Sequence, residues 1–238
     1  MYALLAFSAE VKELGLSTDE TSEASKYYSK SVSLLIDVLS DPQAYDENVL
    51  AAVVLLRMYE ERSINDDRCH LLGQQRLISS MAGFLHVGGL GEAASWVSLR
   101  QDIYVSIVSK QPISIDLRIY EQSHAFERRD DGAWSNVMVY IFARVLALVF
   151  APAHQQSTAE WQELEMKIDE WYITKPKSFD PISFYRPTSS KDRSYREIWM
   201  LNSFHGKFKS LRLQYEALIL SSCWYTVLLF GENLLKGI

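Results

Sequence analysis

The chain has 238 residues, a formal net charge of −6, and 48% hydrophobic residues. This length and apolar content are sufficient for a sizeable core without disulfides or structural metals. The acidic balance lacks the basic surface that neutralises nucleic-acid phosphates, so we expect neither direct nucleic-acid binding nor binding to an anionic membrane.

The cysteine content indicates the compartment. The chain has two cysteines, Cys69 and Cys223, which lie far apart and show no metal-ligand spacing. Isolated thiols are typical of a reducing environment, which predicts a nuclear or cytoplasmic protein. The most apolar runs are shorter than a bilayer span or are interrupted by polar residues, so we expect no transmembrane segment.

Apolar residues at helical spacing, with recognisable start and stop signals, predict helices along the whole chain. Asp46 is the expected N-cap of the third helix, and Ser157 with Glu160 forms a capping box. The expected helices cover residues 2–14, 18–39, 47–61, 68–84, 90–110, 134–150, 157–174 and, as one helix or a pair, 194–235.

The remaining segments are predicted to be connections between the helices. Residues 112–122 are expected to be irregular with one short turn, residues 127–132 a solvated linker, and residues 177–193 a long ordered loop. No strand-like alternation with hairpin turns is recognisable. The sequence therefore predicts an all-α fold of roughly seven to nine helices, forming one domain over residues 1–238.

The helix expected over residues 90–110 is apolar at both ends and polar in its centre. Because buried charges must be paired or hydrogen-bonded, this centre predicts one of two arrangements. The first, which we favour, is an Arg–carboxylate network between two helices, for instance Glu60 or Glu61 with Arg100. The second is the lining of a ligand pocket. The candidate residues for these interpretations are Arg57, Tyr59, Glu60, Glu61, Trp96, Arg100, Gln101, Asp102, Tyr104, Trp199 and His205.

No catalytic motif is recognisable in the sequence. The five histidines form neither HxxxH nor HxH, and no serine lies in GxSxG. The glycines of residues 88–91 lack the lysine of a phosphate-binding loop, so we expect a turn between helices there. These observations predict no metal and no cofactor, and they leave catalytic residues unassigned.

Several segments, in order, resemble the fungal-specific transcription factor domain, the helical region found downstream of six-cysteine zinc clusters. The most specific part is the pair LLRMYEE and LRQDIYV. The segments that carry the resemblance are DENVLAAVVLLRMYEE, RCHLLGQQRLI, LGEAASWVSLRQDIYVSIV, WSNVMVYIFARVLALVF, WQELEMKIDEWYITKPKSFDPI and YREIWMLNSFHGKFKSLRLQYEALIL.

The resemblance implies an all-α regulatory domain of a nuclear regulator of metabolic or secondary-metabolite genes. Such domains are thought to act in effector sensing, repression or self-association. Two cysteines are too few for the zinc cluster, so we expect the DNA-reading module to be absent. The family's domain usually extends further at both ends, and the chain is therefore expected to be a fragment, a truncated gene product or a free-standing relative.

Three functional hypotheses follow from the residues and the resemblance. The first is a regulatory domain without DNA contact, which binds a small effector or a protein partner such as a second copy of itself. The second is a relative recruited as a cofactor-independent enzyme, for example a cyclase, or as a small-molecule binder in a fungal biosynthetic pathway. The third is a dimerising or dominant-negative fragment of a regulator.

Overall fold

The computed structural model describes residues 1–13, 22–62, 77–80, 83, 88–152, 157–185, 197–202 and 205. The contacts divide the chain into two compact units. Unit 1 comprises Met1–Val105 and Ser114–His124, and unit 2 comprises Ser106–Ile113 and Ala125–Ile238. The organisation as one domain over residues 1–238 stays a prediction.

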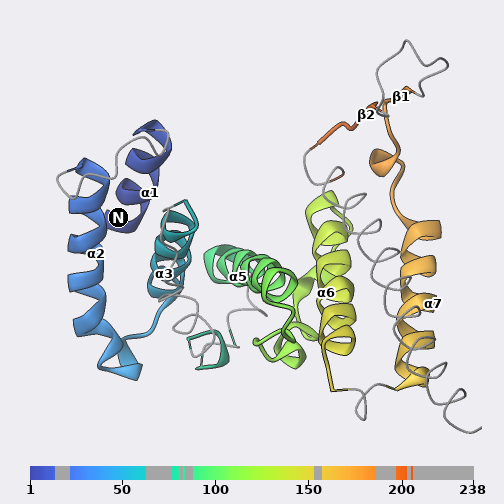
Figure 1. The fold of residues 1–238 in the computed structure, drawn as a ribbon, viewed down its shortest axis with the longest axis horizontal. Coiled ribbons are helices and arrows are strands. Elements are labelled where there is room, and N and C mark those ends of the chain that lie inside the picture. The colour runs from blue at the N-terminus through green and yellow to red at the C-terminus, as the bar shows by residue number, and fades with distance from the viewer. Residues whose placement is uncertain are drawn as a thin grey trace, which may run out of the picture. The chain divides into compact units, whose positions relative to one another are not determined.

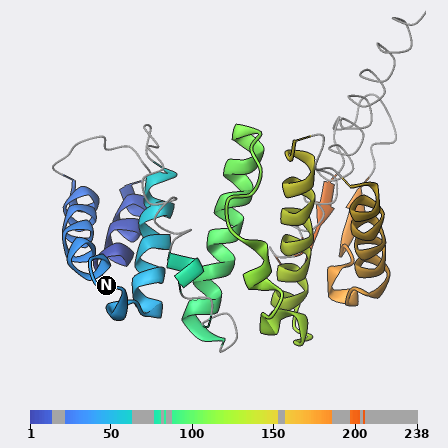
Figure 2. The same cartoon turned by 90° about the horizontal axis from the view of Figure 1, so that it is seen from below.

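Helices dominate the described part of the chain, which confirms the all-α prediction (Figures 1 and 2). Short 3₁₀ turns occur at Pro42–Ala44, Leu117–Tyr120, His124–Phe126 and Lys177–Phe179. The α-helices are α1 (Tyr2–Glu13), α2 (Glu23–Leu39), α3 (Glu47–Glu60), α5 (Gly89–Ser109), α6 (Asp131–Val149) and α7 (Thr158–Thr174).

In unit 1, α1, α2 and α3 lie side by side in both ribbon views. Helix α3 begins where it was predicted, because the Asp46 carboxylate accepts a hydrogen bond from the Val49 amide at 2.8 Å. Its apolar residues Leu50, Val53 and Leu56 are almost fully buried. The continuous apolar run of this helix therefore forms part of the core of unit 1.

The start of α5 is a tight turn fixed by glycine. Gly88 and Gly89 both have a φ of 78°, a conformation that strains residues with a side chain. The Glu47 carboxylate of α3 accepts a hydrogen bond from the Gly91 amide at 3.1 Å. A carboxylate at this position satisfies a free helical N–H and complements the helix dipole, so it ties α3 to the first turn of α5.

In unit 2, α6 packs beside α7. Helix α7 begins at the predicted cap, since the Ser157 hydroxyl accepts a hydrogen bond from the Glu160 amide at 3.4 Å. Its buried residues Leu164, Ile168 and Trp171 recur at helical spacing and form one stripe. This stripe gives α7 a single apolar face.

Helix α6 is the most apolar element described. Its length and hydropathy would allow it to cross a membrane, but 61% of its most apolar window is buried in the structure. A buried core helix has the same composition.

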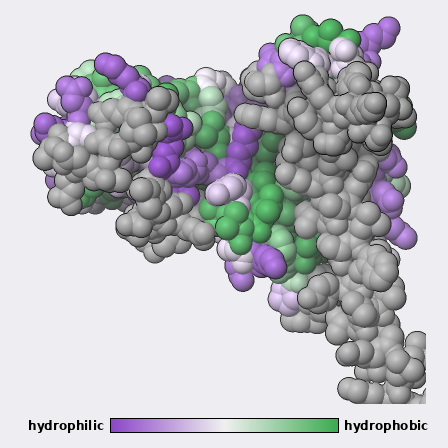
Figure 3. All heavy atoms as spheres, turned by 45° about the horizontal axis from the view of Figure 1, so that its top comes forward, coloured by the Kyte–Doolittle hydropathy of each residue, from purple (hydrophilic) through white to green (hydrophobic). Residues whose placement is uncertain are grey.

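Large apolar side chains elsewhere in unit 2, such as Met166 and Ile173 of α7, remain exposed. Figure 3 shows hydrophobic and hydrophilic atoms in separate patches on the drawn face.

The prediction that the chain has no strands is wrong at one place. The strands β1 (Ser183–Tyr185) and β2 (Glu197–Trp199) pair antiparallel, with Ser183 opposite Trp199. The helix predicted to begin at residue 194 is therefore wrong over β2, and the predicted loop over residues 177–193 contains a 3₁₀ turn and β1. Aromatic and β-branched residues favour extended backbone, and the cross-strand pairing here overrides a weak helical pattern.

Two predicted helix boundaries are also wrong. Helix α2 begins at Glu23, since the Ser22 hydroxyl caps the Ser25 amide, whereas the sequence predicted a start at residue 18. Helix α6 begins at Asp131, inside the predicted linker, because Asp130 is its N-cap. Of the predicted helix over residues 68–84, residues 77–80 are helical. Its other residues, except 83, and those from 206 onwards, lie outside the described residues.

Candidate functional site

The first group of sequence-predicted site residues joins α2 to α3 in unit 1. Arg57 is fully buried, and its guanidinium lies 3.5 Å from carboxylate oxygens of both Glu60 and Glu61. The Tyr28 hydroxyl of α2 donates a hydrogen bond to Glu60 at 3.1 Å. The rings of Tyr28 and Tyr59 stack with their centres 4.7 Å apart. The charged end of α3 is thus a contact between two helices.

The second group lies in the centre of α5. Asp102 is 1% exposed, and its Oδ2 accepts hydrogen bonds from the backbone amides of Ser114 at 2.8 Å and Ile115 at 2.9 Å. Burial raises the pKa of the Asp102 carboxyl, and these two hydrogen bonds act in the opposite direction. Asp102 therefore anchors the segment after α5 to the middle of the helix.

The neighbours of Asp102 also contact backbone. The Gln101 side-chain amide donates to the Val54 carbonyl of α3 at 3.5 Å. The Arg100 guanidinium donates to the Trp96 carbonyl one turn earlier at 2.8 Å, and burial lowers the pKa of Arg100. In contrast, Tyr104 is 58% exposed. The polar centre of α5 thus contributes hydrogen bonds to α3 and to its own helix.

The structure divides the eleven sequence-predicted residues between the two units. Nine lie in unit 1, whereas Trp199 and His205 belong to unit 2, where Trp199 is 66% exposed and His205 is fully buried. Within unit 1, Arg57, Glu60 and Glu61 form one cluster at the end of α3. A ligand site formed by this set stays a prediction.

Unit 2 contains a pocket that the sequence did not predict. Its volume is about 490 Å³, within the range typical of small-molecule sites. Its walls come from α6, α7 and the segment that precedes α6. The lining residues are Ala125, Phe126, Arg128, Arg129, Trp134, Val137, Tyr140, Ile141, Lys167, Glu170, Trp171 and Thr174.

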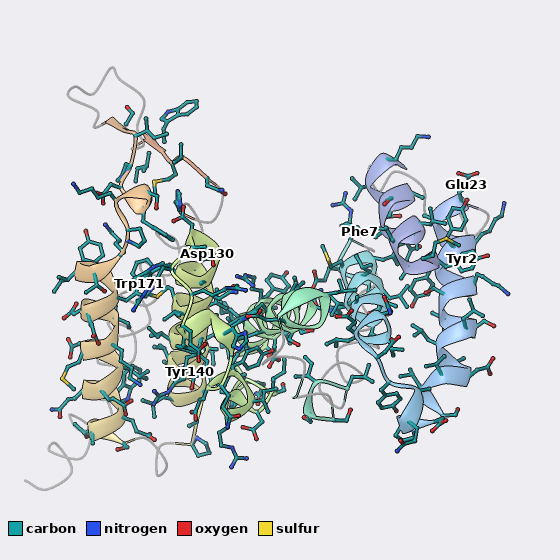
Figure 4. The ribbon with its side chains drawn as sticks, turned by 180° about the vertical axis from the view of Figure 1, so that it is seen from behind. Tyr2, Phe7, Glu23, Asp130, Tyr140 and Trp171 are labelled. Atoms are coloured by element: carbon teal, nitrogen blue, oxygen red, sulfur yellow. The ribbon has the colours of Figure 1, made fainter. Side chains whose placement is uncertain are left out.

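Aromatic side chains form much of the pocket wall. Trp134 and Trp171 meet edge to face, with ring centres 5.8 Å apart, and the Trp171 indole N–H donates to the Trp134 carbonyl at 3.0 Å. Phe126 and Tyr140 form a second edge-to-face pair at 5.4 Å. Figure 4 labels Trp171 between α6 and α7, and Tyr140 on α6. These paired rings hold one another in place and give the pocket a preformed aromatic surface.

Charged groups near the pocket form a network that crosses from α6 to α7. Glu163 lies 2.8 Å from the Lys167 ammonium and 3.1 Å from the Arg144 guanidinium. Hydrogen bonds from Lys167 and then Arg144 lower the pKa of Glu163 to about 2. On the segment before α6, Arg128 pairs with Asp130 at 3.2 Å. Arg144 and Glu163 therefore connect α6 to α7 beside the pocket.

A second polar cluster gathers around the first residue of α6. Asp131 accepts a hydrogen bond from the Ser178 hydroxyl at 2.7 Å and lies 2.9 Å from His205 Nε2. The Ser178 hydrogen bond, and then the His205 contact, lower the pKa of Asp131. The His205 ring lies 4.4 Å from the ring of Phe179, and its Nδ1 is buried without a hydrogen-bond partner among the described residues. This cluster joins the start of α6 to the segments after α7.

The sequence did not predict the pocket, and of the polar cluster it predicted His205 alone. Residues 127–132 were expected to be a linker, although Arg128 and Arg129 line the pocket and Asp131 contacts Ser178 and His205. The aromatic spacing of α7 was visible in the sequence, but which helix that face would meet was not. A run of charged residues directly before an apolar helix, with Asp130 as N-cap, is the signal that points to this region.

Comparison with known protein families gives one result for the chain. The family described as "Fungal specific transcription factor domain" matches residues 1–205. No curated protein and no solved structure matches the chain.

Proposed function

Because the chain belongs to the fungal specific transcription factor domain family, we propose that it is the effector-binding domain of a fungal transcription regulator. The effector occupies the pocket of unit 2, and the domain itself does not contact DNA. It acts in the nucleus on biosynthetic genes, alone or as a homodimer.

The observation that supports this proposal is the aromatic-walled pocket of about 490 Å³. Ligand sites are mostly apolar cavities of about 300–1,000 Å³ with a few polar groups that orient the ligand. The pocket combines tryptophan, tyrosine and phenylalanine walls with a small set of charged residues. A ligand bound there would contact both α6 and α7, and would bias how these two helices pack.

The effector hypothesis is tested by filling the pocket. Val137 lines the pocket and is half-buried, so Val137→Trp places an indole in the cavity without removing core volume. Val108 in α5 is 54% exposed and does not line the pocket, so Val108→Trp is the matched control. Loss of ligand binding in the first variant but not in the second is the expected result.

Native mass spectrometry of the chain purified from a fungal host is the direct measurement. We expect a bound small molecule in the wild type and in Val108→Trp, and its loss in Val137→Trp. A reporter gene driven by the chain fused to a DNA-binding module should respond to that molecule in the same pattern. Wild-type protein without bound molecule, and without thermal shift in host extract, would contradict the proposal.

The same material separates the effector hypothesis from the enzyme hypothesis. The recovered molecule is incubated with fresh protein and analysed again by mass. An effector is recovered chemically unchanged, whereas a substrate of a cofactor-independent enzyme is converted into a product.

A further inference from the structure

Among the residues that line the pocket, cations outnumber carboxylates, whereas the chain as a whole is acidic. The chain carries a formal net charge of −6. Three cationic residues line the pocket, Arg128, Arg129 and Lys167, against one carboxylate, Glu170. A cation that lines a pocket beside an apolar wall and has no carboxylate partner attracts ligands of the opposite charge. This arrangement favours an anionic ligand.

The three cations differ in how they are already used. Lys167 pairs with Glu163 at 2.8 Å, and Arg128 pairs with Asp130 at 3.2 Å. Arg129 is exposed and forms no ion pair among the residues that the structure describes. Guanidinium N–H groups match the two oxygens of a carboxylate in geometry. Arg129 can therefore bind a ligand carboxylate without breaking an existing ion pair.

The walls favour a flat, apolar ligand body. The Trp171 indole N–H already donates to the Trp134 carbonyl, so the Trp171 ring offers carbon rather than a free N–H to the pocket. Tyr140 is buried and packs edge to face against Phe126. Aromatic walls of this kind bind planar rings through offset stacking and edge contacts.

We propose that the pocket selects a planar, largely apolar carboxylate, with its ring against Trp134 and Trp171 and its carboxylate at Arg129. This inference rests on the proposed function, because it names the ligand class of the same pocket. The carboxyl group of such a ligand has a pKa of about 4, so it is charged at neutral pH.

A matched pair of probes tests the inference on the full chain. Naphthalene-2-carboxylate and naphthalene-2-carboxamide have nearly the same shape and differ in charge. Isothermal titration at neutral pH and low salt should show binding of the carboxylate about tenfold or more tighter than the amide, because the carboxylate alone forms an ion pair with the guanidinium, whereas the amide oxygen is neutral.

Two variants assign the difference to one side chain. Arg129→Gln should weaken carboxylate binding by about tenfold and leave amide binding unchanged. Arg62 is an exposed arginine after α3 in unit 1, so Arg62→Gln removes the same charge elsewhere and should change neither affinity. Both variants should match the wild type in thermal stability, since both arginines are exposed.

The outcomes distinguish the ligand class from the pocket itself. Equal binding of the two probes, or an unchanged carboxylate affinity in Arg129→Gln, would overturn the anion inference. If Val137→Trp nevertheless abolished binding of the probes, the probes would still bind in the pocket, and the proposed function would be retained. Absence of saturable binding of both probes, with no bound molecule in native mass spectra, would overturn the inference and the proposed function together.

Discussion

Charged residues have different surroundings in the two units. In unit 1, Asp102 and Arg57 are almost completely buried and contact backbone amides or carboxylates of their own unit. In unit 2, Arg128 and Arg129 are exposed at the edge of a pocket. Buried charges are costly unless they are paired, whereas exposed charges contribute little to stability. Unit 1 therefore shows how buried polar groups hold helices together, whereas in unit 2 the side chains of Arg128 and Arg129 stay exposed at the pocket edge.

The largest effect on stability is expected from Arg57. Replacement by Met leaves Glu60 and Glu61 beside a buried site without their cation, and should lower the free energy of unfolding by about 2–3 kcal/mol. The Glu61 side chain is 27% exposed, which limits the loss, whereas Glu60 is buried. Urea unfolding followed by far-UV circular dichroism measures it. Arg62→Met, on the exposed side of the same helix end, should cost less than about 0.5 kcal/mol. Similar losses in both variants would contradict the structural role of Arg57.

The next effect concerns Asp102. Asp102→Ala removes the acceptor of two backbone amides and should lower the free energy of unfolding by about 2 kcal/mol. Asp102→Asn keeps an acceptor oxygen and removes the ionisable group, so its loss should be smaller.

The pH dependence of Asp102→Asn sharpens this prediction. Burial raises the pKa of Asp102 in the folded state above its ordinary value of 3.8. The folded state then holds the proton more tightly, so the stabilisation by this group is complete below the ordinary pKa and declines as pH rises. The stability of the wild type relative to Asp102→Asn should therefore fall as pH rises above the ordinary pKa of 3.8. A rising difference would show that the carboxylate is stabilised by its two amides more than it is penalised by burial.

The smallest effect, with the opposite sign, is expected from Asp131 in unit 2. The Ser178 hydrogen bond and the His205 contact lower the pKa of Asp131, so its stabilisation is present above the ordinary pKa of 3.8 and is lost as pH falls. The Asp131 side chain is 36% exposed, so screening by solvent limits the contribution to about 0.5 kcal/mol. Thermal unfolding of Asp131→Asn should differ from the wild type at neutral pH and converge with it at acid pH. Ser178→Ala should reproduce part of the effect.

Local signals in the sequence predicted most of the helices, because each signal acts within one or two turns. Asp46 and Ser157 cap the helices that they were expected to begin. The strands at 183–185 and 197–199 were missed, since the pairing of Ser183 with Trp199 is a contact between distant residues. Propensity within either segment gives no information about that partner.

The candidate site was harder to predict, for the same physical reason. The polar centre of α5 was visible as Arg100, Gln101 and Asp102, but the partners of Asp102 at Ser114 and Ile115 depend on how the chain turns after the helix. The pocket requires α6 to meet α7 and the segment before α6 to fold over them. A charged segment that lines a pocket has the same composition as a linker exposed to solvent. Only its tertiary contacts distinguish one from the other.

Hydrogen–deuterium exchange of the full chain, with and without naphthalene-2-carboxylate, tests the contrast between the units most directly. The proposed site predicts slower exchange in peptides covering residues 125–141 and 167–174, which carry the pocket lining. Peptides covering Arg57 and the centre of α5 should exchange at the same rate in both states. Protection centred on residues 96–104 with none at the pocket would contradict the proposed site and support the ligand site predicted from the sequence instead.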